Sequence, residues 1–152
     1  MGDRAEILFS SALDKRGIPW RYANKEEQIQ KHIDFHTDRG TVDVKSMKRI
    51  NRVDYNPQQD FVWLEFQNVK GNTGWLCSKV DYIAFERPND FVIVDRQRLL
   101  ELAKSLCDLT SITRQGGIKA LYRGYQRWGN KDIISMIKMS DVLTLPFKSL
   151  LK

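Results

Sequence analysis

Apolar positions near the start of the chain follow helical spacing. Five apolar side chains recur three and four residues apart, at Ala5, Leu8, Phe9, Ala12 and Leu13. This spacing places them on one face of an amphipathic helix. We therefore expect a helix over residues 3–16, which Gly17 ends.

Farther along the chain the pattern changes to short runs rich in β-branched and aromatic residues, which are typical of strands. We expect strands at 32–36, 41–47, 61–66, 82–85, 91–94 and 132–139. Apolar spacing predicts a helix over 96–106, and Ser140-Asp141 begins a short final helix. Residues 19–31 and 49–60 are polar, with prolines, and are expected to be connections. The pattern as a whole predicts one α/β domain, with an N-terminal helix followed by a mixed β-sheet flanked by helices.

The first two expected strands form a hairpin around Thr37-Asp-Arg-Gly40, because Gly40 supplies the positive φ of a tight turn. Alternate side chains of a strand point to opposite faces. Asp43 and Lys45 therefore project together, and Asp34 on the preceding strand points away from its apolar neighbours. A hairpin brings Asp34 close to Asp43.

Two carboxylates at that range repel each other unless a cation lies between them, and hard oxygen ligands suit Mg²⁺, for which Mn²⁺ can substitute. Lys45 would supply a positive charge for a phosphate oxygen or an attacking water. The alternative is a surface hairpin in which Asp43 and Lys45 form a weak exposed ion pair.

The chain carries Asp34, then eight residues, then Asp43-Val44-Lys45. This pattern resembles the motif of the PD-(D/E)XK nuclease superfamily, which has the restriction-endonuclease-like fold. The resemblance implies a nuclease core over about 3–106, in which Glu6 supplies the acid of the first helix. It also implies that Glu6, Asp34, Asp43 and the Val44 carbonyl hold Mg²⁺, and that Lys45 assists the attack of water on a phosphodiester.

Four other polar side chains are candidates for accessory roles. His32 and His36 share the face of Asp34, so they are expected either to support the acidic site or to form a His-Asp-His zinc cluster with it. Glu65 and Gln67 share a polar face of the third strand. If that strand adjoins the hairpin, one of them can orient a water at the metal; otherwise the pattern is plain surface alternation.

Charge is concentrated in the C-terminal third. The chain has 25 Lys and Arg against 19 Asp and Glu, a net charge of +6. Between Thr110 and Lys138 six cations and one carboxylate give +5 of that total. A polyanion, and above all DNA, is the expected partner, bound by the segment 107–152 together with cations just after the hairpin. The alternative is a solvated face that is basic for solubility. The expected phosphate contacts are Lys48, Arg49, Arg52, Arg114, Lys119, Arg123, Arg127 and Lys131.

Basic residues at 119, 123, 127 and 131 recur every four positions, as on a helix, although two glycines weaken a long helix there. Aromatic residues are interleaved with them. Tyr122 and Trp128 are expected either to lie in the core or its edge, or to stack on nucleic-acid bases.

Composition agrees with a globular protein, with 41% apolar and 29% charged residues and no run long enough to span a membrane. Cys77 and Cys107 are expected to be free thiols in a reducing cytoplasm, although a single bridge remains open. The N-terminus lacks the apolar stretch of a secretory signal, so we expect a location in the cytoplasm, or in the host cytoplasm for a phage protein.

These observations predict a single-domain, Mg²⁺-dependent DNA endonuclease of the homing or another site-specific type. A Holliday-junction resolvase and a non-catalytic nucleic-acid-binding module are the alternatives. Because one active site cuts one strand, duplex cleavage calls for a homodimer or a higher homo-oligomer.

Overall fold

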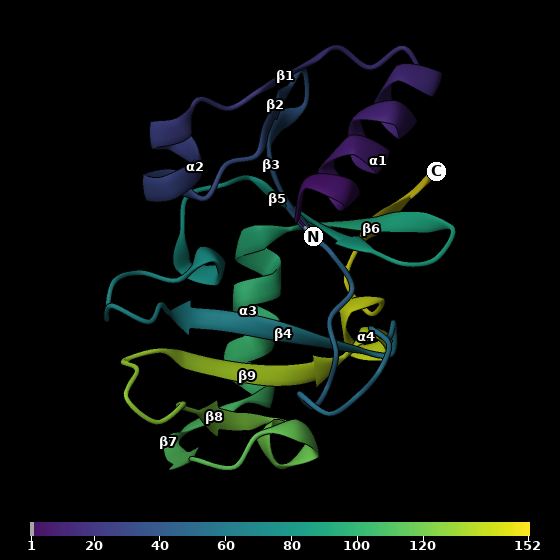
Figure 1. The fold of residues 1–152 in the computed structure, drawn as a ribbon. Helices are drawn as coiled ribbons and strands as arrows, with labels where there is room; N and C mark the ends of the chain where they lie inside the picture. Colours follow the sequence, from purple (N-terminus) through teal and green to yellow (C-terminus); the bar gives the residue numbers. More distant parts are fainter. Residues whose placement is uncertain (1) are drawn as a thin grey trace. The chain divides into compact units, whose positions relative to one another are not determined.

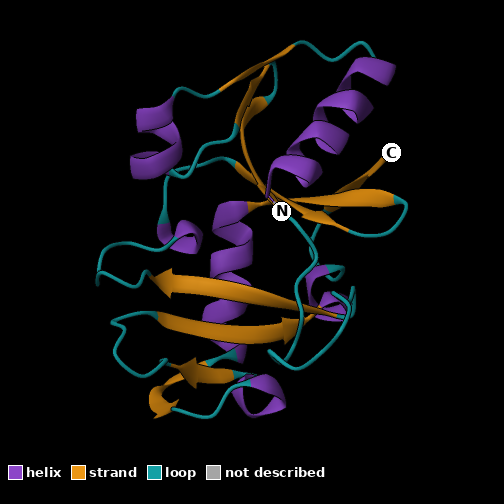
Figure 2. Cartoon of the chain, in the orientation of Figure 1, coloured by secondary structure: helices purple, strands orange, loops and turns teal. Residues whose placement is uncertain are grey.

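The computed structural model describes residues 2–152, with side chains from residue 4 onward. It is a mixed α/β structure with four α-helices and two mixed sheets, in agreement with the α/β class expected from the sequence (Figures 1 and 2). The helices are α1 (Gly2–Lys15), α2 (Lys25–Lys31), α3 (Arg96–Leu106) and α4 (Met139–Val142).

Contacts divide the chain into two compact units that alternate along the sequence. The first comprises the chain up to Met47, then Lys79–Arg96 and Pro146–Lys152, and the second comprises Lys48–Ser78 and Gln97–Leu145. Residues 48–78 and 97–106, which the sequence placed in a nuclease core over 3–106, therefore belong to the second unit.

A six-stranded sheet forms the first unit, with its strands in the order β1-β2-β3-β5-β6-β10. β3 pairs with β5 in parallel, and every other neighbouring pair in this sheet is antiparallel. The strands span, in chain order, Trp20–Tyr22, Phe35–Thr37, Gly40–Lys45, Tyr82–Glu86, Asp90–Asp95 and Phe147–Leu151.

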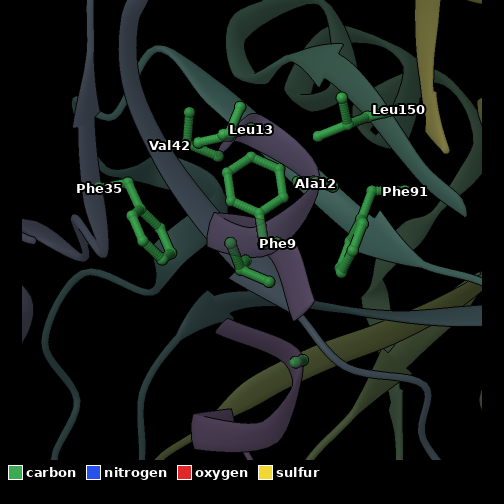
Figure 3. Packing of buried hydrophobic residues seen from close by; sticks show 10 residues of the cluster. Phe9, Ala12, Leu13, Phe35, Val42, Phe91 and Leu150 are labelled. Carbon is green, nitrogen blue, oxygen red and sulfur yellow. The ribbon is translucent and has the colours of Figure 1, made fainter. Parts of the chain in front are cut away.

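Helix α1 packs on one face of this sheet through the apolar stripe that its sequence predicts. Phe9 lies in the middle of the cluster, with its ring centroid 5.2 Å from both Phe35 and Phe91 (Figure 3). Val42 and Val44 of β3 join the same cluster, so this face of the hairpin is fixed by buried apolar area. Asp43, which lies between them on β3, must then point to the opposite face.

A buried carboxylate ties the two ends of the chain to this sheet. The Glu86 side chain has no solvent exposure, and it accepts hydrogen bonds from Arg4 at 2.7 and 2.8 Å and from Lys152 at 2.8 Å. Burial alone would raise the pKa of Glu86, but Lys152 and Arg4 together hold it below its ordinary value. Helix α1 and the end of β10 are thus fastened to the end of β5.

The second unit contains a four-stranded sheet with the order β4-β9-β8-β7. Its strands are β4 (Phe61–Gln67), β7 (Asp108–Thr113), β8 (Arg123–Tyr125) and β9 (Ile133–Lys138). β4 and β9 run antiparallel (Figure 1). At this ladder Leu64, Met136 and Ile137 are completely buried. Short 3₁₀ turns occur at Trp75–Cys77 and Gly117–Ala120.

Most of the expected helices and strands are present, but one expectation was wrong. Residues 19–31 are not a plain connection, because they contain β1 and α2. The sequence left a helix or a loop open for the segment 119–131, and the structure has no α-helix there: the segment contains the end of a 3₁₀ turn, the three residues of β8 and a loop. The chain also continues past α4 into β10, which the sequence analysis did not predict.

Both cysteines are free thiols, as expected. No helix in the described part of the chain is long and apolar enough to cross a membrane.

Candidate functional site

The expected hairpin is present and aligns the two aspartates. β2 and β3 pair with Phe35 opposite Val42, a register that places Asp34 level with Asp43. The Asp34 amide donates to the Val42 carbonyl at 2.9 Å, and its Oδ2 accepts the Val44 amide at 2.8 Å. Asp34 is therefore held by its own backbone and by its side chain. At the turn, Gly40 has φ 137°, as the sequence predicted.

Asp43 is buried, with 4% of its surface exposed. Its partner on the parallel strand β5 is Ile83, which is fully buried and points to the same face of the sheet. Lys45 is half-buried, and its Nζ lies 3.1 Å from Asp43 Oδ2. These facts exclude the alternative of a solvent-exposed ion pair on a surface hairpin.

One oxygen of the Asp43 carboxyl lacks a well-directed hydrogen bond. Oδ2 is inaccessible to solvent, and its charged neighbour is the Lys45 ammonium 3.1 Å away. A buried oxygen without a hydrogen bond costs about 1–3 kcal/mol, and more when it is charged. Such an atom is expected where a carboxylate is kept for a ligand that the protein alone does not provide.

Burial raises the pKa of Asp43 to about 8. The Lys45 charge works against this rise, whereas Asp34 adds to it through repulsion and through a hydrogen bond that favours the protonated form. The neutral form of Asp43 is thus favoured near neutral pH when no cation is bound, and a bound cation would relieve the same repulsion and favour the anionic carboxylate. Strongly shifted carboxyl groups of this kind are concentrated at functional sites.

Glu6 lies half-buried on α1, the helix that packs against β3. Among the residues that the structure describes, no group of three or more His, Cys, Asp or Glu side chains is placed to hold a metal ion. The structure therefore brings together Asp34, Asp43 and Lys45, and it does not bring Glu6 into a set of three acids with the aspartates.

The two histidines do not form a cluster with Asp34. His36 Nε2 lies 2.6 Å from Glu27 Oε2 on α2, so its imidazole is engaged by an acid outside the expected site. His32 is the C-cap residue of α2, with φ 57°, so its backbone has the role of ending that helix. The zinc cluster considered from the sequence is absent from the described residues.

Glu65 and Gln67 lie on β4, which pairs with β9 in the second sheet. They could orient water at the hairpin only if β4 adjoined it. This condition is not met, because the neighbours of β3 in its sheet are β2 and β5. The Gln67 amide instead donates to the Lys131 carbonyl at 2.6 Å. Of the two interpretations left open by the sequence, the one that required β4 beside the hairpin is therefore not supported.

All eight cations expected to contact phosphate belong to the second unit, whereas Asp34, Asp43, Lys45 and Glu6 belong to the first. Six of the eight are exposed, namely Lys48, Arg49, Arg52, Arg114, Lys119 and Lys131. Arg123 is half-buried and donates to the Ser111 hydroxyl at 3.1 Å. The expected separation of catalytic and gripping residues thus coincides with the division of the chain into units.

Arg127 has a structural partner that the sequence did not reveal. Its Nε lies 2.8 Å from Oδ2 of Asp132, a residue with no solvent exposure. Asp132 is the one acid between Thr110 and Lys138, and Arg127 offsets its charge inside the unit. Arg127 therefore stabilises a buried carboxylate in addition to any contact with a partner.

Sequence reasoning left open whether Trp128 belongs to the core, and the structure places it on the surface with 79% exposure. The Arg114 guanidinium lies 4.4 Å from the centroid of its ring. The sequence signal for an exposed Trp128 was the stretch Arg127-Trp-Gly-Asn-Lys131, in which turn residues directly follow the tryptophan. Tyr122, the other open case, is half-buried and its hydroxyl donates to Asp141 at 2.6 Å.

No family model, curated protein or solved structure matches the chain. The resemblance to the PD-(D/E)XK nucleases therefore depends on the motif and the hairpin geometry alone.

Proposed function

We propose that the chain is a metal-dependent DNA endonuclease with the restriction-endonuclease-like fold, of the homing or another site-specific type. The observation that carries the proposal is the buried Asp43 carboxyl, set against Asp34 and 3.1 Å from Lys45. The proposal is also supported by helix α1, which precedes the β2–β3 hairpin, and by β5, which lies parallel to β3 in the same sheet.

The residues present fit a divalent cation. Asp34 and Asp43 offer hard oxygens that are anionic once a cation is bound, and the buried Oδ2 of Asp43 has no well-directed hydrogen bond beside its ion pair with Lys45. We assign Mg²⁺ or Mn²⁺ to this pair and the Val44 carbonyl, with waters and phosphate oxygens completing the shell. Glu6 is kept as a proposed further ligand, which a metal titration of Glu6→Gln tests.

A bound divalent ion would lower the pKa of a water ligand and offset negative charge on the phosphate. Lys45 would act on the attacking water and on the phosphate. With its half-buried ammonium beside Asp43, it would position the attacking water and donate to a non-bridging oxygen as charge develops there. Its charge acts mainly on the transition state, so its removal should impair the chemical step more than binding.

Exposed cations of the second unit would bind the DNA backbone without reading bases, because contacts to phosphate carry no sequence information. Counterion release makes such binding strongly dependent on salt. The hairpin site is single, so cutting both strands of a duplex would require a second copy of the chain.

The decisive experiment incubates the full chain with supercoiled plasmid and with a four-way junction, each with Mg²⁺ and with EDTA. We expect Mg²⁺-dependent nicking or linearisation by the wild type and a large loss with Lys45→Ala. Cleavage confined to the junction would instead identify a Holliday-junction resolvase. Retained DNA binding with no metal-dependent cleavage of either substrate would identify a non-catalytic binding module and refute the nuclease.

A further inference from the structure

Trp128 is exposed to an extent that needs a physical explanation. It is 79% exposed, whereas Trp75 is 7% exposed and the remaining two tryptophans are half-buried. A large ring left in water gives up the stabilisation of about 2–3 kcal/mol that burial would provide. An exposed indole beside cations is typical of a binding surface.

The loop that carries Trp128 is held at its base. The Arg127–Asp132 ion pair, 2.8 Å long and closed on a fully buried carboxylate, joins the two sides of the loop. The Lys131 amide also donates to the Val69 carbonyl at 3.1 Å, which fastens the loop to the chain that follows β4. Trp128 is therefore displayed from a fixed loop, and ordering it on a ligand costs little entropy.

One face of the Trp128 ring is covered by Arg114, whose guanidinium lies 4.4 Å from the ring centroid. Because the side chain is still 79% exposed, the opposite face is open to a flat ligand. Arg114 also donates to the Arg127 carbonyl at 3.5 Å, which helps to keep the stack in place. A planar cation stacked on an indole leaves its edge free to bind a phosphate.

Contacts bring a second basic segment next to this stack. The Trp63 indole donates to the Arg49 carbonyl at 3.0 Å, and its ring centroid lies 6.1 Å from that of Tyr125. The Tyr125 hydroxyl lies against Gly116, 2.9 Å from the position that a Cβ atom on this residue would occupy. The segment containing Arg49 is thus adjacent to the turn just after Arg114, and Arg49 and Arg114 are both exposed.

This combination identifies the chemistry of the occupant. Cations require a polyanion, and the open ring face requires a flat π-system that is not already stacked. In a duplex the faces of the bases are covered by their neighbours, whereas in a single strand they are free to stack on aromatic side chains. A protein or membrane partner would be bound through a wide apolar area, whereas the side chain that packs on Trp128 is a cation.

We propose that Trp128, backed by Arg114, is a stacking platform for an unpaired base of single-stranded DNA. The inference rests on the proposed nuclease function and names its substrate class: DNA that carries a single-stranded segment, as in a flap or a branch.

Binding is tested on the full chain in EDTA, by fluorescence anisotropy with a labelled oligothymidylate and with a duplex of equal length. Trp128→Leu keeps apolar bulk but removes the π-system, and should weaken single-strand binding by roughly tenfold or more. Trp128→Phe should retain most of the affinity, and duplex binding should change less than about twofold. Because Trp128 is exposed, each variant should fold, which far-UV circular dichroism checks.

Tyr55→Leu is the matched control, because Tyr55 is 95% exposed in the same unit and lies outside the loop that carries Trp128. It should bind both DNAs like wild type. Equal losses with Tyr55→Leu, equal losses on single strand and duplex, or wild-type binding by Trp128→Leu would each overturn the proposal.

Cleavage assays keep this proposal distinct from the proposed function. If Mg²⁺ produces no cleavage but single-strand binding still depends on Trp128, the nuclease fails and the platform stands. If the wild type cleaves a flap and Trp128→Leu binds and cleaves it equally well, the platform alone fails.

Discussion

Replacing Asp43 with asparagine tests the physical core of the proposed site. The pKa of Asp43 is raised from 3.8 to about 8, so the folded protein holds this proton far more tightly than the unfolded chain does. The native state is therefore favoured most, with respect to this group, at low pH. That advantage is lost as pH rises from about 4 to about 8, when the buried carboxyl must ionise.

The size of the effect follows from the same shift. One proton bound only in the folded state changes the free energy of unfolding by at most about 1.4 kcal/mol per pH unit. Between pH 5 and pH 8 the wild type should lose about 3 kcal/mol relative to Asp43→Asn, which has no charge to bury. The variant should thus become the more stable protein near neutral pH, despite losing the attraction of Lys45.

Urea unfolding at pH 5, 6, 7 and 8, without divalent ions, measures this difference. Asp38→Asn is the matched control, because Asp38 lies exposed in the turn of the same hairpin, and its stability should follow that of the wild type at each pH. Addition of Mn²⁺ at pH 8 should stabilise the wild type and leave Asp43→Asn nearly unchanged. A pH-independent difference between the variant and the wild type would refute the reasoning about the buried carboxyl.

Three further predictions concern other charges. Lys45→Ala should lower cleavage at saturating DNA by about 100-fold or more and change DNA affinity less than twofold, as measured by single-turnover and binding assays. Arg127→Ala should lower the free energy of unfolding by about 2 kcal/mol, because it leaves the fully buried Asp132 unpaired. Lys131→Ala should leave urea unfolding unchanged and lower the salt slope of DNA binding by about one. The pKa of Glu86 is lowered, so its stabilisation is present above pH 4.5 and lost on acidification; Glu86→Gln should therefore be less stable at pH 7, and the difference should shrink toward pH 3 in urea unfolding.

Local pattern sufficed to predict the elements of the candidate site. The alternation along β3 put Val42 and Val44 on one face and Asp43 on the other, and Gly40 marked the turn that sets Asp34 beside Asp43. The apolar stripe of α1 predicted the helix that covers the valines. Each of these features depends on residues within a few positions of one another, where backbone geometry fixes which side chains share a face.

Other segments carried no such local signal. No residue of α2 is buried, so it lacks an apolar stripe, and its mark was the capping box formed by Asn24 and Glu27. β1 has three residues, too few to show a period. The partners of β4 and β10 could not be derived either, because a strand sequence states which face is apolar but not which neighbour it will pair with.

The sequence by itself determined that two aspartates and a lysine lie together on a short hairpin and that positive charge gathers in the C-terminal third. Tertiary structure alone decided that Asp43 is buried beside Ile83, some forty residues away, that β4 belongs to another sheet, and that Trp128 stays in solvent. Burial depends on which distant segment covers a side chain. The pKa of a carboxyl and the exposure of a ring follow from that covering, so neither can be derived from the neighbouring residues.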